Sequence, residues 1–160
     1  NPGTTGFTIT EDLMARLAGI AGVEAIKNPP APEGDFVGQI ARLRIAAKEG
    51  FSLGYSGDSA ILGALRASAD AWYSVLAGTL PAPAIRLWAA RKDDAALAAA
   101  AEPLVPLLRT FDTYGSIRVV HEVTGMIGLG AVAPPLPLQP LDAEARKTIE
   151  AAVEGVLVAA

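Results

Sequence analysis

The chain has 160 residues, a length that suits one domain or part of a larger one. About half of it is hydrophobic (51%) and 19% is charged, which excludes a disordered chain. The formal charge of −4 provides no basic surface for nucleic acid or an anionic membrane. No uncharged apolar run reaches the roughly 18 residues that span a bilayer. We therefore expect a globular protein that binds neither nucleic acid nor a membrane.

Residue types that bind metals or act as thiols are scarce. The chain has no cysteine and one histidine, His121. This excludes a disulfide framework, a cysteine-based zinc site, an iron–sulfur cluster and a histidine-rich metal centre. The lack of cysteine also fits a reducing, cytoplasmic compartment. We expect His121 to be a structural or interface residue.

The first half of the chain alternates between helical and strand patterns. In chain order, the sequence predicts a helix that ends at Gly22, a strand over 23–27, a helix over 35–48, a strand over 51–55, a helix over 59–68 and a strand over 71–76. Units that recur at about 25 residues predict parallel strands joined by crossover helices. From residue 84 onward the pattern predicts helices alone, over 84–112, 115–128 and 142–158.

Capping signals and apolar spacing define the first three helices. Thr8 with Glu11 is a capping-box pattern, and Asp58 is expected to be the N-cap of the third helix. The first helix places Leu13, Leu17 and Ile20 at helical spacing. The second places on one face the apolar residues Phe36, Ile40, Leu43 and Ala47.

Three parallel strands cannot make an ordinary closed domain, because both faces and both edges of the sheet need cover. The expected fold is α/β: the C-terminal part of a (β/α)8 TIM barrel, strands six to eight, followed by a helical C-terminal tail. Residues 1–83 would hold the barrel part, and 84–160 the last barrel helix and the helical extension. Such barrels need about 250 residues, so we expect the chain to begin mid-protein, with the N-terminal half of the barrel missing.

Lys27 is the candidate for chemistry. It alone of the four lysines closes a predicted strand, and Val23, Ala25 and Lys27 share one face of it. In a barrel that face points inward, and the carboxyl ends of the strands carry the active site. Desolvation there favours the neutral amine, which can attack a carbonyl. On spacing alone, a lysine that ends a strand and extends into solvent is the commoner case.

Five segments carry a resemblance to a known family: residues 1–7, 22–27, 54–58, 70–75 and 134–138. In their order and spacing they resemble the dihydrodipicolinate synthase and N-acetylneuraminate lyase family. In that family a Tyr-Asn-x-Pro turn follows strand five, and the Schiff-base lysine ends strand six in a Gly-Ile-Lys context. A Ser-Gly-Asp segment follows strand seven, strand eight usually reads Gly-x-Gly-x-Ile-Ser-Val, and an Arg-x-Pro-Leu stretch precedes the last helix.

The resemblance implies a class I aldolase or lyase that condenses or cleaves pyruvate and an aldehyde or keto acid. Lys27 would form the imine, while Gly57 and Tyr73 would lie against the substrate. No metal or organic cofactor is needed, and the protein is expected to form a homo-oligomer, a dimer or tetramer. The resemblance places the family's proton-shuttling tyrosine and its carboxylate-binding threonine loop before Asn1. Alternatives are a 2-keto-3-deoxy sugar acid aldolase and a non-catalytic binding homologue.

Several positions depart from the family pattern. The lyase branch carries an Asp-Glu pair for a sugar tail, and here Ser59 and Ala60 stand in its place. This argues against a sialic-acid substrate. The usual isoleucine of strand eight is Tyr73, and Trp72 precedes it. Two aromatic side chains would narrow the pocket or stack on a flat acceptor.

Overall fold

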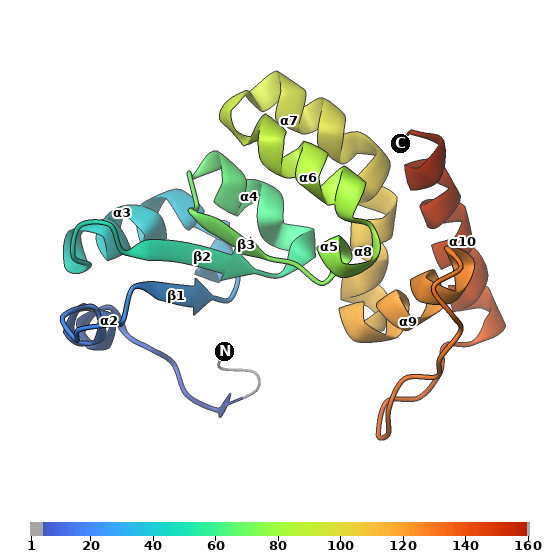
Figure 1. Cartoon of the computed structure of the whole chain (residues 1–160), viewed down its shortest axis with the longest axis horizontal. Coiled ribbons are helices and arrows are strands. Elements are labelled where there is room, and N and C mark those ends of the chain that lie inside the picture. The colour runs from blue at the N-terminus through green and yellow to red at the C-terminus, as the bar shows by residue number, and fades with distance from the viewer. Residues whose placement is uncertain (1–4, 160) are drawn as a thin grey trace. The chain divides into compact units, whose positions relative to one another are not determined.

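Three short parallel strands form one sheet in the computed structural model, which describes residues 5–159 (Figure 1). They are β1 (Ala25–Asn28), β2 (Ser52–Ser56) and β3 (Ala71–Tyr73), in the order β1-β2-β3. The crossovers contain α3 (Phe36–Ala46) and α4 (Ile61–Arg66), each preceded by a short 3-10 helix, η1 (Pro32–Gly34) and η2 (Asp58–Ala60). The prediction of an α/β fold with parallel strands is confirmed.

The contacts divide the chain into two units, Asn1–Tyr73 and Ser74–Ala160. The sequence predicts a boundary between residues 83 and 84, whereas the contacts divide the chain between residues 73 and 74. The reason is that α5 (Leu76–Thr79) packs on α6 (Pro81–Ala89) and belongs with the helices that follow. None of the helices within residues 5–159 is long and apolar enough to cross a membrane.

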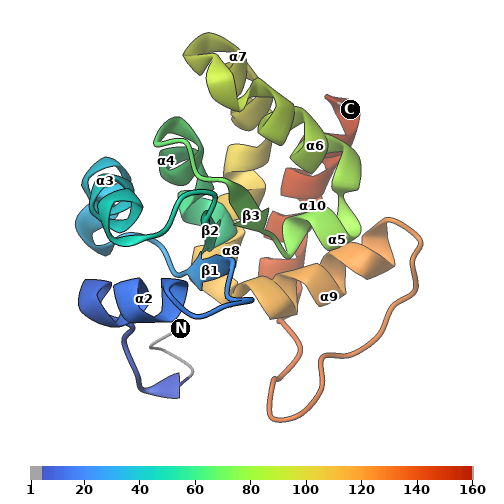
Figure 2. The same ribbon diagram turned by 60° about the vertical axis from the view of Figure 1, so that its left-hand side comes forward.

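One face of the sheet is covered by α3 and α4 (Figure 2). Tyr55 of β2 is fully buried there, and its ring meets that of Phe36 edge-on, with centroids 5.3 Å apart. The Tyr55 hydroxyl donates a hydrogen bond to Gln39 Oε1 at 2.7 Å, which ties β2 to α3. Phe36, Ile40 and Leu43 are buried as their spacing predicts, whereas Ala47 lies just beyond the end of α3. This face is the core of the first unit.

Asp70 joins the amino ends of β2 and β3. Its backbone N–H donates to Leu53 O at 2.9 Å, and its Oδ2 accepts from Leu53 N at 2.7 Å. Arg44, in the last turn of α3, donates to the same Oδ2 at 2.5 Å and to Phe51 O at 2.9 Å. One carboxylate thus links both strands to α3 before the first ladder hydrogen bond between β2 and β3.

The helix before β1 differs from its prediction. α2 (Glu11–Ala18) has Thr10 as its N-cap, whose Oγ1 accepts from Leu13 N at 3.3 Å, and it ends at Gly19. The prediction of Thr8 as the capping residue and Gly22 as the end was therefore wrong, because a capping oxygen must stand directly before the first turn. The buried residues are Met14 and Ala18, while Ile20 lies beyond the helix and is 52% exposed.

The second unit is helical, as the sequence predicts. Its elements are α5, α6, η3 (Ala90–Lys92), α7 (Asp94–Ala101), η4 (Glu102–Leu104), α8 (Val105–Tyr114), α9 (Ser116–Met126) and α10 (Ala143–Val158). The region 84–112 is divided among several helices because Asp93 caps α7, accepting from Ala95 N and Ala96 N, and because prolines stand in the first turns of η4 and α8. Leu87, Leu107 and Ile149 are among its fully buried core residues.

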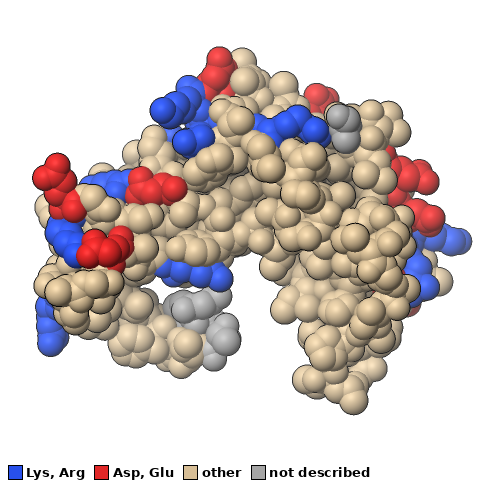
Figure 3. Space-filling view, viewed as in Figure 1, with Lys and Arg blue, Asp and Glu red and all other residues tan. Residues whose placement is uncertain are grey.

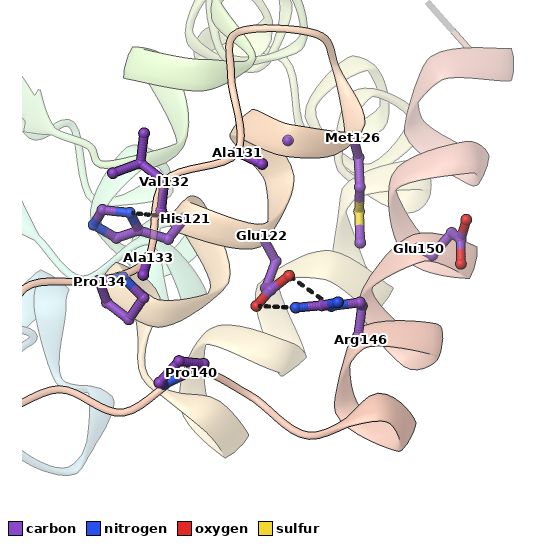
Figure 4. Close-up of a pocket in the computed structure, with 11 residues that line it drawn as sticks. His121, Glu122, Met126, Ala131, Val132, Ala133, Pro134, Pro140, Arg146 and Glu150 are labelled. Carbon is purple, nitrogen blue, oxygen red and sulfur yellow. Dashed lines mark hydrogen bonds and ion pairs between the residues drawn. The ribbon is translucent and has the colours of Figure 1, made fainter.

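Side chains of α9 hold the segment that joins it to α10 (Figure 4). His121 Nδ1 lies 2.9 Å from Val132 O, and Arg118 Nε donates to Gln139 O at 2.8 Å. Arg146 of α10 forms an ion pair with Glu122, at 2.9 Å. A cavity of about 430 Å³ is lined by, among others, His121, Val132, Glu122 and Arg146. The place of His121 agrees with the structural role expected for it.

Because the phenol of Tyr55 is buried, we expect the free energy of unfolding to decrease at alkaline pH. Burial raises the pKa of Tyr55 to about 12 from its usual 10. Between these values the unfolded chain loses the phenol proton while the folded chain keeps it, so the free energy of unfolding falls as pH rises. In Tyr55→Phe this loss is absent. Between about pH 9 and about pH 11, we expect the complete polypeptide to lose on the order of 1 kcal/mol more than the variant in urea unfolding.

Tyr55→Phe is a matched control for the parent protein, because both contain every other titrating group. The lost hydrogen bond to Gln39 lowers the stability of the variant by a similar amount at both pH values. Equal losses for the parent and Tyr55→Phe would contradict a buried, neutral phenol.

Candidate active site

Lys27 lies near the carboxyl end of β1, on the sheet face opposite Tyr55. Of the four lysines it is the one on a strand: Lys48 follows α3, Lys92 is in η3 and Lys147 is in α10. Its side chain is exposed, and among the described residues it has no ion-pair partner, whereas Lys48 pairs with Glu24 at 2.7 Å. The amine of Lys27 is therefore available to a ligand.

Tyr73 lies beside Lys27 across the central strand. Lys27 pairs in register with Gly54 of β2, and Gly54 with Ala71 of β3, so these positions form one row. Gly54 has no side chain, and a Cβ placed there would overlap the Tyr73 ring. The ring therefore extends over Gly54, and Lys27 Nζ lies 5.5 Å from its centroid. This is within the about 6 Å of a cation–π contact.

Trp72 is on the other face of the sheet, and this corrects the expectation that both aromatics narrow the pocket. Successive residues of a strand point to opposite sides, so only Tyr73 shares the face of Lys27. Trp72 pairs in register with buried Tyr55, and its indole Nε1 donates to Asp58 Oδ1 at 2.8 Å.

Asp58 is a buried hydrogen-bond acceptor. It is 4% exposed and is the first residue of η2, and Ala60 rather than Asp58 stands in the N-cap position of α4. Its bond from Trp72 joins the turn after β2 to β3. The prediction of Asp58 as the N-cap of a helix over 59–68 was wrong, because a 3-10 turn begins at Asp58 and α4 starts only after it.

The residue after Lys27 fixes the ends of two strands. Asn28 is 8% exposed, and its side-chain amide donates to Gly54 O at 3.4 Å. In return, the hydroxyl of Ser56 donates to Asn28 O at 3.0 Å. The backbone that carries Lys27 is thus held against β2 by two side chains. Sequence reasoning missed both partners; the only available signal was a polar residue directly after the candidate lysine.

Gly57 forms the turn after β2 with a φ of +91°, a conformation that favours glycine. A Cβ at this position would lie 2.6 Å from Cγ of Pro30, which is in the segment after β1. The neighbour that excludes a side chain here is therefore Pro30. The turn brings Gly57 to the same end of the sheet as Lys27.

A cleft of about 430 Å³ opens beside Lys27. Phe7, Thr8 and Ile9, ahead of α2, form one part of its wall, and residues 28–30 with Pro32 form another. Ile26 and Gln39 complete it. Within residues 5–159 no group of three or more acidic, histidine or cysteine side chains could hold a metal ion. The chemistry that the described residues offer at this end of the sheet is that of an amine next to an aromatic ring and an apolar cleft.

Known proteins resemble this chain over nearly its whole length. The model of the dihydrodipicolinate synthetase family matches residues 1–156. No curated protein matches the chain. A dihydrodipicolinate synthase from Agrobacterium tumefaciens is 38% identical with a TM-score of 0.94, over 98% of this chain and 53% of that protein. A putative dihydrodipicolinate synthetase from Pseudomonas aeruginosa is 26% identical with a TM-score of 0.83, over 98% and 53%.

More distant structures share the fold. The 4-hydroxy-tetrahydrodipicolinate synthase from Methylacidiphilum fumariolicum is 22% identical with a TM-score of 0.84, over 99% of this chain and 52% of that one. The chain thus spans about half the length of the solved structures that it matches. Because the family model covers nearly all of its residues, the chain belongs to the dihydrodipicolinate synthetase family.

Proposed function

We propose that the protein containing this chain is a pyruvate-dependent class I aldolase or lyase whose Schiff base forms on Lys27. One observation carries the proposal: Lys27 is the one lysine on a strand, it stands near that strand's carboxyl end, and it has no ion-pair partner among the described residues. Family membership and the likeness to the Agrobacterium synthase support the same chemistry.

The proposed reaction proceeds through an enamine. The neutral amine of Lys27 adds to C2 of pyruvate, and the resulting carbinolamine takes up a proton and loses water, which leaves a protonated imine. Loss of a proton from C3 gives the enamine, which attacks the aldehyde carbon. A carbon–carbon bond forms and the aldehyde oxygen takes up a proton. Water then hydrolyses the imine, releasing a 4-hydroxy-2-keto acid and restoring the amine; cleavage is the reverse. Proton transfer and binding of the pyruvate carboxylate are assigned to chain outside these 160 residues.

The sheet supports a barrel as the context of the site. Within the described residues, β1 and β3 each pair only with β2, so each has one unpaired edge. The sheet face that carries Ala25 and Lys27 is exposed. Parallel sheets are otherwise covered on both faces. We assign β1, β2 and β3 to strands six, seven and eight of a (β/α)8 barrel, completed by the N-terminal half of the fold. As in the family resemblance, the assembled protein is proposed to be a homo-oligomer.

Gly57 and Tyr73 are proposed to shape the substrate site. Gly57 presents backbone without a side chain at the end of the sheet where Lys27 lies. The Tyr73 ring, 41% exposed, extends over Gly54 toward Lys27. A ring in this place limits the space beside an imine on Lys27. We assign it the role of restricting the aldehyde.

The Schiff base can be trapped by reduction. We expect the complete polypeptide, treated with pyruvate and sodium borohydride, to carry a covalent adduct on Lys27. Lys27→Ala should lose the adduct and remain folded, because the side chain is exposed and forms no ion pair. Peptide mapping by mass spectrometry identifies the modified residue.

Lys48→Ala is the matched control, since Lys48 pairs with Glu24 away from the strand ends, and it should retain the adduct. A protein that traps no pyruvate would instead be a non-catalytic homologue. An adduct confined to Lys48, Lys92 or Lys147 would refute the assignment of Lys27.

Tyr73 can be tested by changing the volume of its side chain. Tyr73→Ile should widen the range of aldehydes accepted while leaving borohydride trapping intact, because the imine depends on Lys27. Tyr73→Phe separates size from the hydroxyl group and should keep the parental range. The measurement is the relative kcat/KM across aldehydes of increasing size. An unchanged profile in Tyr73→Ile would make Tyr73 a packing residue.

The barrel assignment can be tested on residues 1–160 alone. Two open sheet edges and an exposed sheet face should make this product aggregated or molten. Size-exclusion chromatography and thermal melting followed by circular dichroism give the answer. A monomer with a cooperative transition would show that the sheet does not need further strands.

A further inference from the structure

Ser56, the last residue of β2, connects two residues of the proposed site. Its hydroxyl donates to Asn28 O at 3.0 Å, and Asn28 directly follows Lys27. Its backbone leads directly into the turn at Gly57. We propose that Ser56 is a positioning residue, whose hydroxyl holds the end of β1 so that the Lys27 amine is aimed at a substrate carbonyl beside Gly57. This inference rests on the proposed function, because it presupposes a Schiff base on Lys27.

Two prolines make the end of β1 depend on side chains. β1 ends at Asn28, and the next residues are Pro29 and Pro30, neither of which has a backbone N–H. They therefore cannot donate a further ladder hydrogen bond to β2. Strand pairing ends where Asn28 stands in register with Tyr55. The Ser56 hydroxyl adds a hydrogen bond to the Asn28 carbonyl at the point where β1 has no more backbone donors to offer.

The segment after Lys27 contacts β2 and its turn at two further points. The side-chain amide of Asn28 donates to Gly54 O at 3.4 Å, and Gly54 is the register partner of Lys27. A Cβ at Gly57 would lie 2.6 Å from Cγ of Pro30, so the turn packs closely on this segment. Lys27 thus precedes a residue that is bonded to β2 through both its carbonyl and its side chain. A shift of β1 along β2 would break these bonds and would move Lys27 relative to Gly57.

These bonds next to Lys27 are neutral, in contrast to those at the other end of the sheet. Near the amino ends of the strands, Lys48 pairs with Glu24, and Arg44 pairs with Asp70. Charged side chains of both signs gather over α2 and α3 in Figure 3. A carboxylate at the carboxyl end of β1 would instead pair with the Lys27 amine in its charged form, which cannot attack a carbonyl. A bond from a hydroxyl to a carbonyl holds the strand without engaging the amine.

The far side of the turn after β2 is held independently of Ser56. The indole Nε1 of Trp72 donates to Asp58 Oδ1 at 2.8 Å, and Asp58 is buried. Removal of the Ser56 hydroxyl therefore leaves the turn attached to β3 and leaves the Asn28 amide bonded to β2. We expect Ser56→Ala to fold, with the change confined to the placement of the end of β1.

The experiment follows the rate at which the Lys27 adduct forms. The complete polypeptide is mixed with pyruvate, samples are reduced with borohydride at timed intervals, and mass spectrometry gives the fraction modified. A series of pyruvate concentrations gives the maximal rate constant and the half-saturating concentration. For Ser56→Ala we expect the maximal rate constant to fall about tenfold, because a displaced amine is less well aligned with the bound carbonyl. The half-saturating concentration should stay within about twofold, since binding of the pyruvate carboxylate is assigned to other parts of the protein.

Two further variants separate the hydroxyl of Ser56 from the rest of the strand. Ser56→Thr keeps a hydroxyl donor at the same position and should retain the parental rate constant within about twofold. Ser52→Ala is the matched control. Ser52 lies on the same face of β2, near its amino end, and its side chain forms no hydrogen bond with the described residues. Ser52→Ala should also retain the parental rate constant. Thermal melting of each variant measures whether it is folded.

The possible failures are distinct. Absence of a pyruvate adduct in the parent overturns the proposed function and this inference with it. A Lys27 adduct that forms in Ser56→Ala at the parental rate overturns this inference alone. The same holds if Ser56→Ala does not fold, if Ser56→Thr or Ser52→Ala is equally slow, or if only the half-saturating concentration changes. A folded but slow Ser56→Ala, with parental rates in Ser56→Thr and Ser52→Ala, supports the inference.

Discussion

The missing side chain at Gly54 is the constraint on which the candidate site depends. Gly54 stands on the central strand between Lys27 and Ala71, and its empty position is filled by the Tyr73 ring. Any larger residue would displace that ring and separate it from Lys27, whose Nζ lies 5.5 Å from the ring centroid. Two side chains from the outer strands can meet over the middle one only because the middle one presents backbone. A glycine in the interior of a strand is usually unfavourable, and the space that the Tyr73 ring needs explains the glycine at this position.

The support of the site comes from the opposite face and from the strand ends. Tyr55 anchors β2 to α3 through Phe36 and Gln39, so the strand cannot shift relative to the helix without exposing a buried phenol. Asn28 and Asp58 act at the carboxyl ends, where each bonds to a group on a neighbouring strand. Much of the rigidity that positions Lys27 is therefore supplied by residues on the opposite face of the sheet and at the strand ends.

The helix predictions succeeded where interactions between residues close in the sequence determine the helix, and failed where interactions between distant segments do. The buried stripe of α3 follows from apolar spacing within eleven residues, and the structure has it as predicted. The start of α2 was misplaced because Thr8 and Glu11 form a capping-box pattern in the sequence, whereas the N-cap is Thr10, which has Leu13 three residues later and does not fit that pattern. Trp72 was misassigned for a stronger reason. Its hydrogen bond to Asp58 joins residues of different elements, and neither residue's sequence neighbours reveal it.

The sequence by itself determined the order of helices and strands, the parallel sheet that such alternation requires, and the place of Lys27 near a strand end. These follow from period, turn residues and the geometry of crossovers, all of which act over short stretches of chain. Tertiary structure alone decided that Tyr73 rather than Trp72 faces Lys27, that Pro30 excludes a side chain at Gly57, and that Phe7 and Ile9 share a cleft with residues 28–32. Each of these depends on packing between segments that are far apart in the sequence. The residue pattern within one segment does not indicate which other segment packs against it.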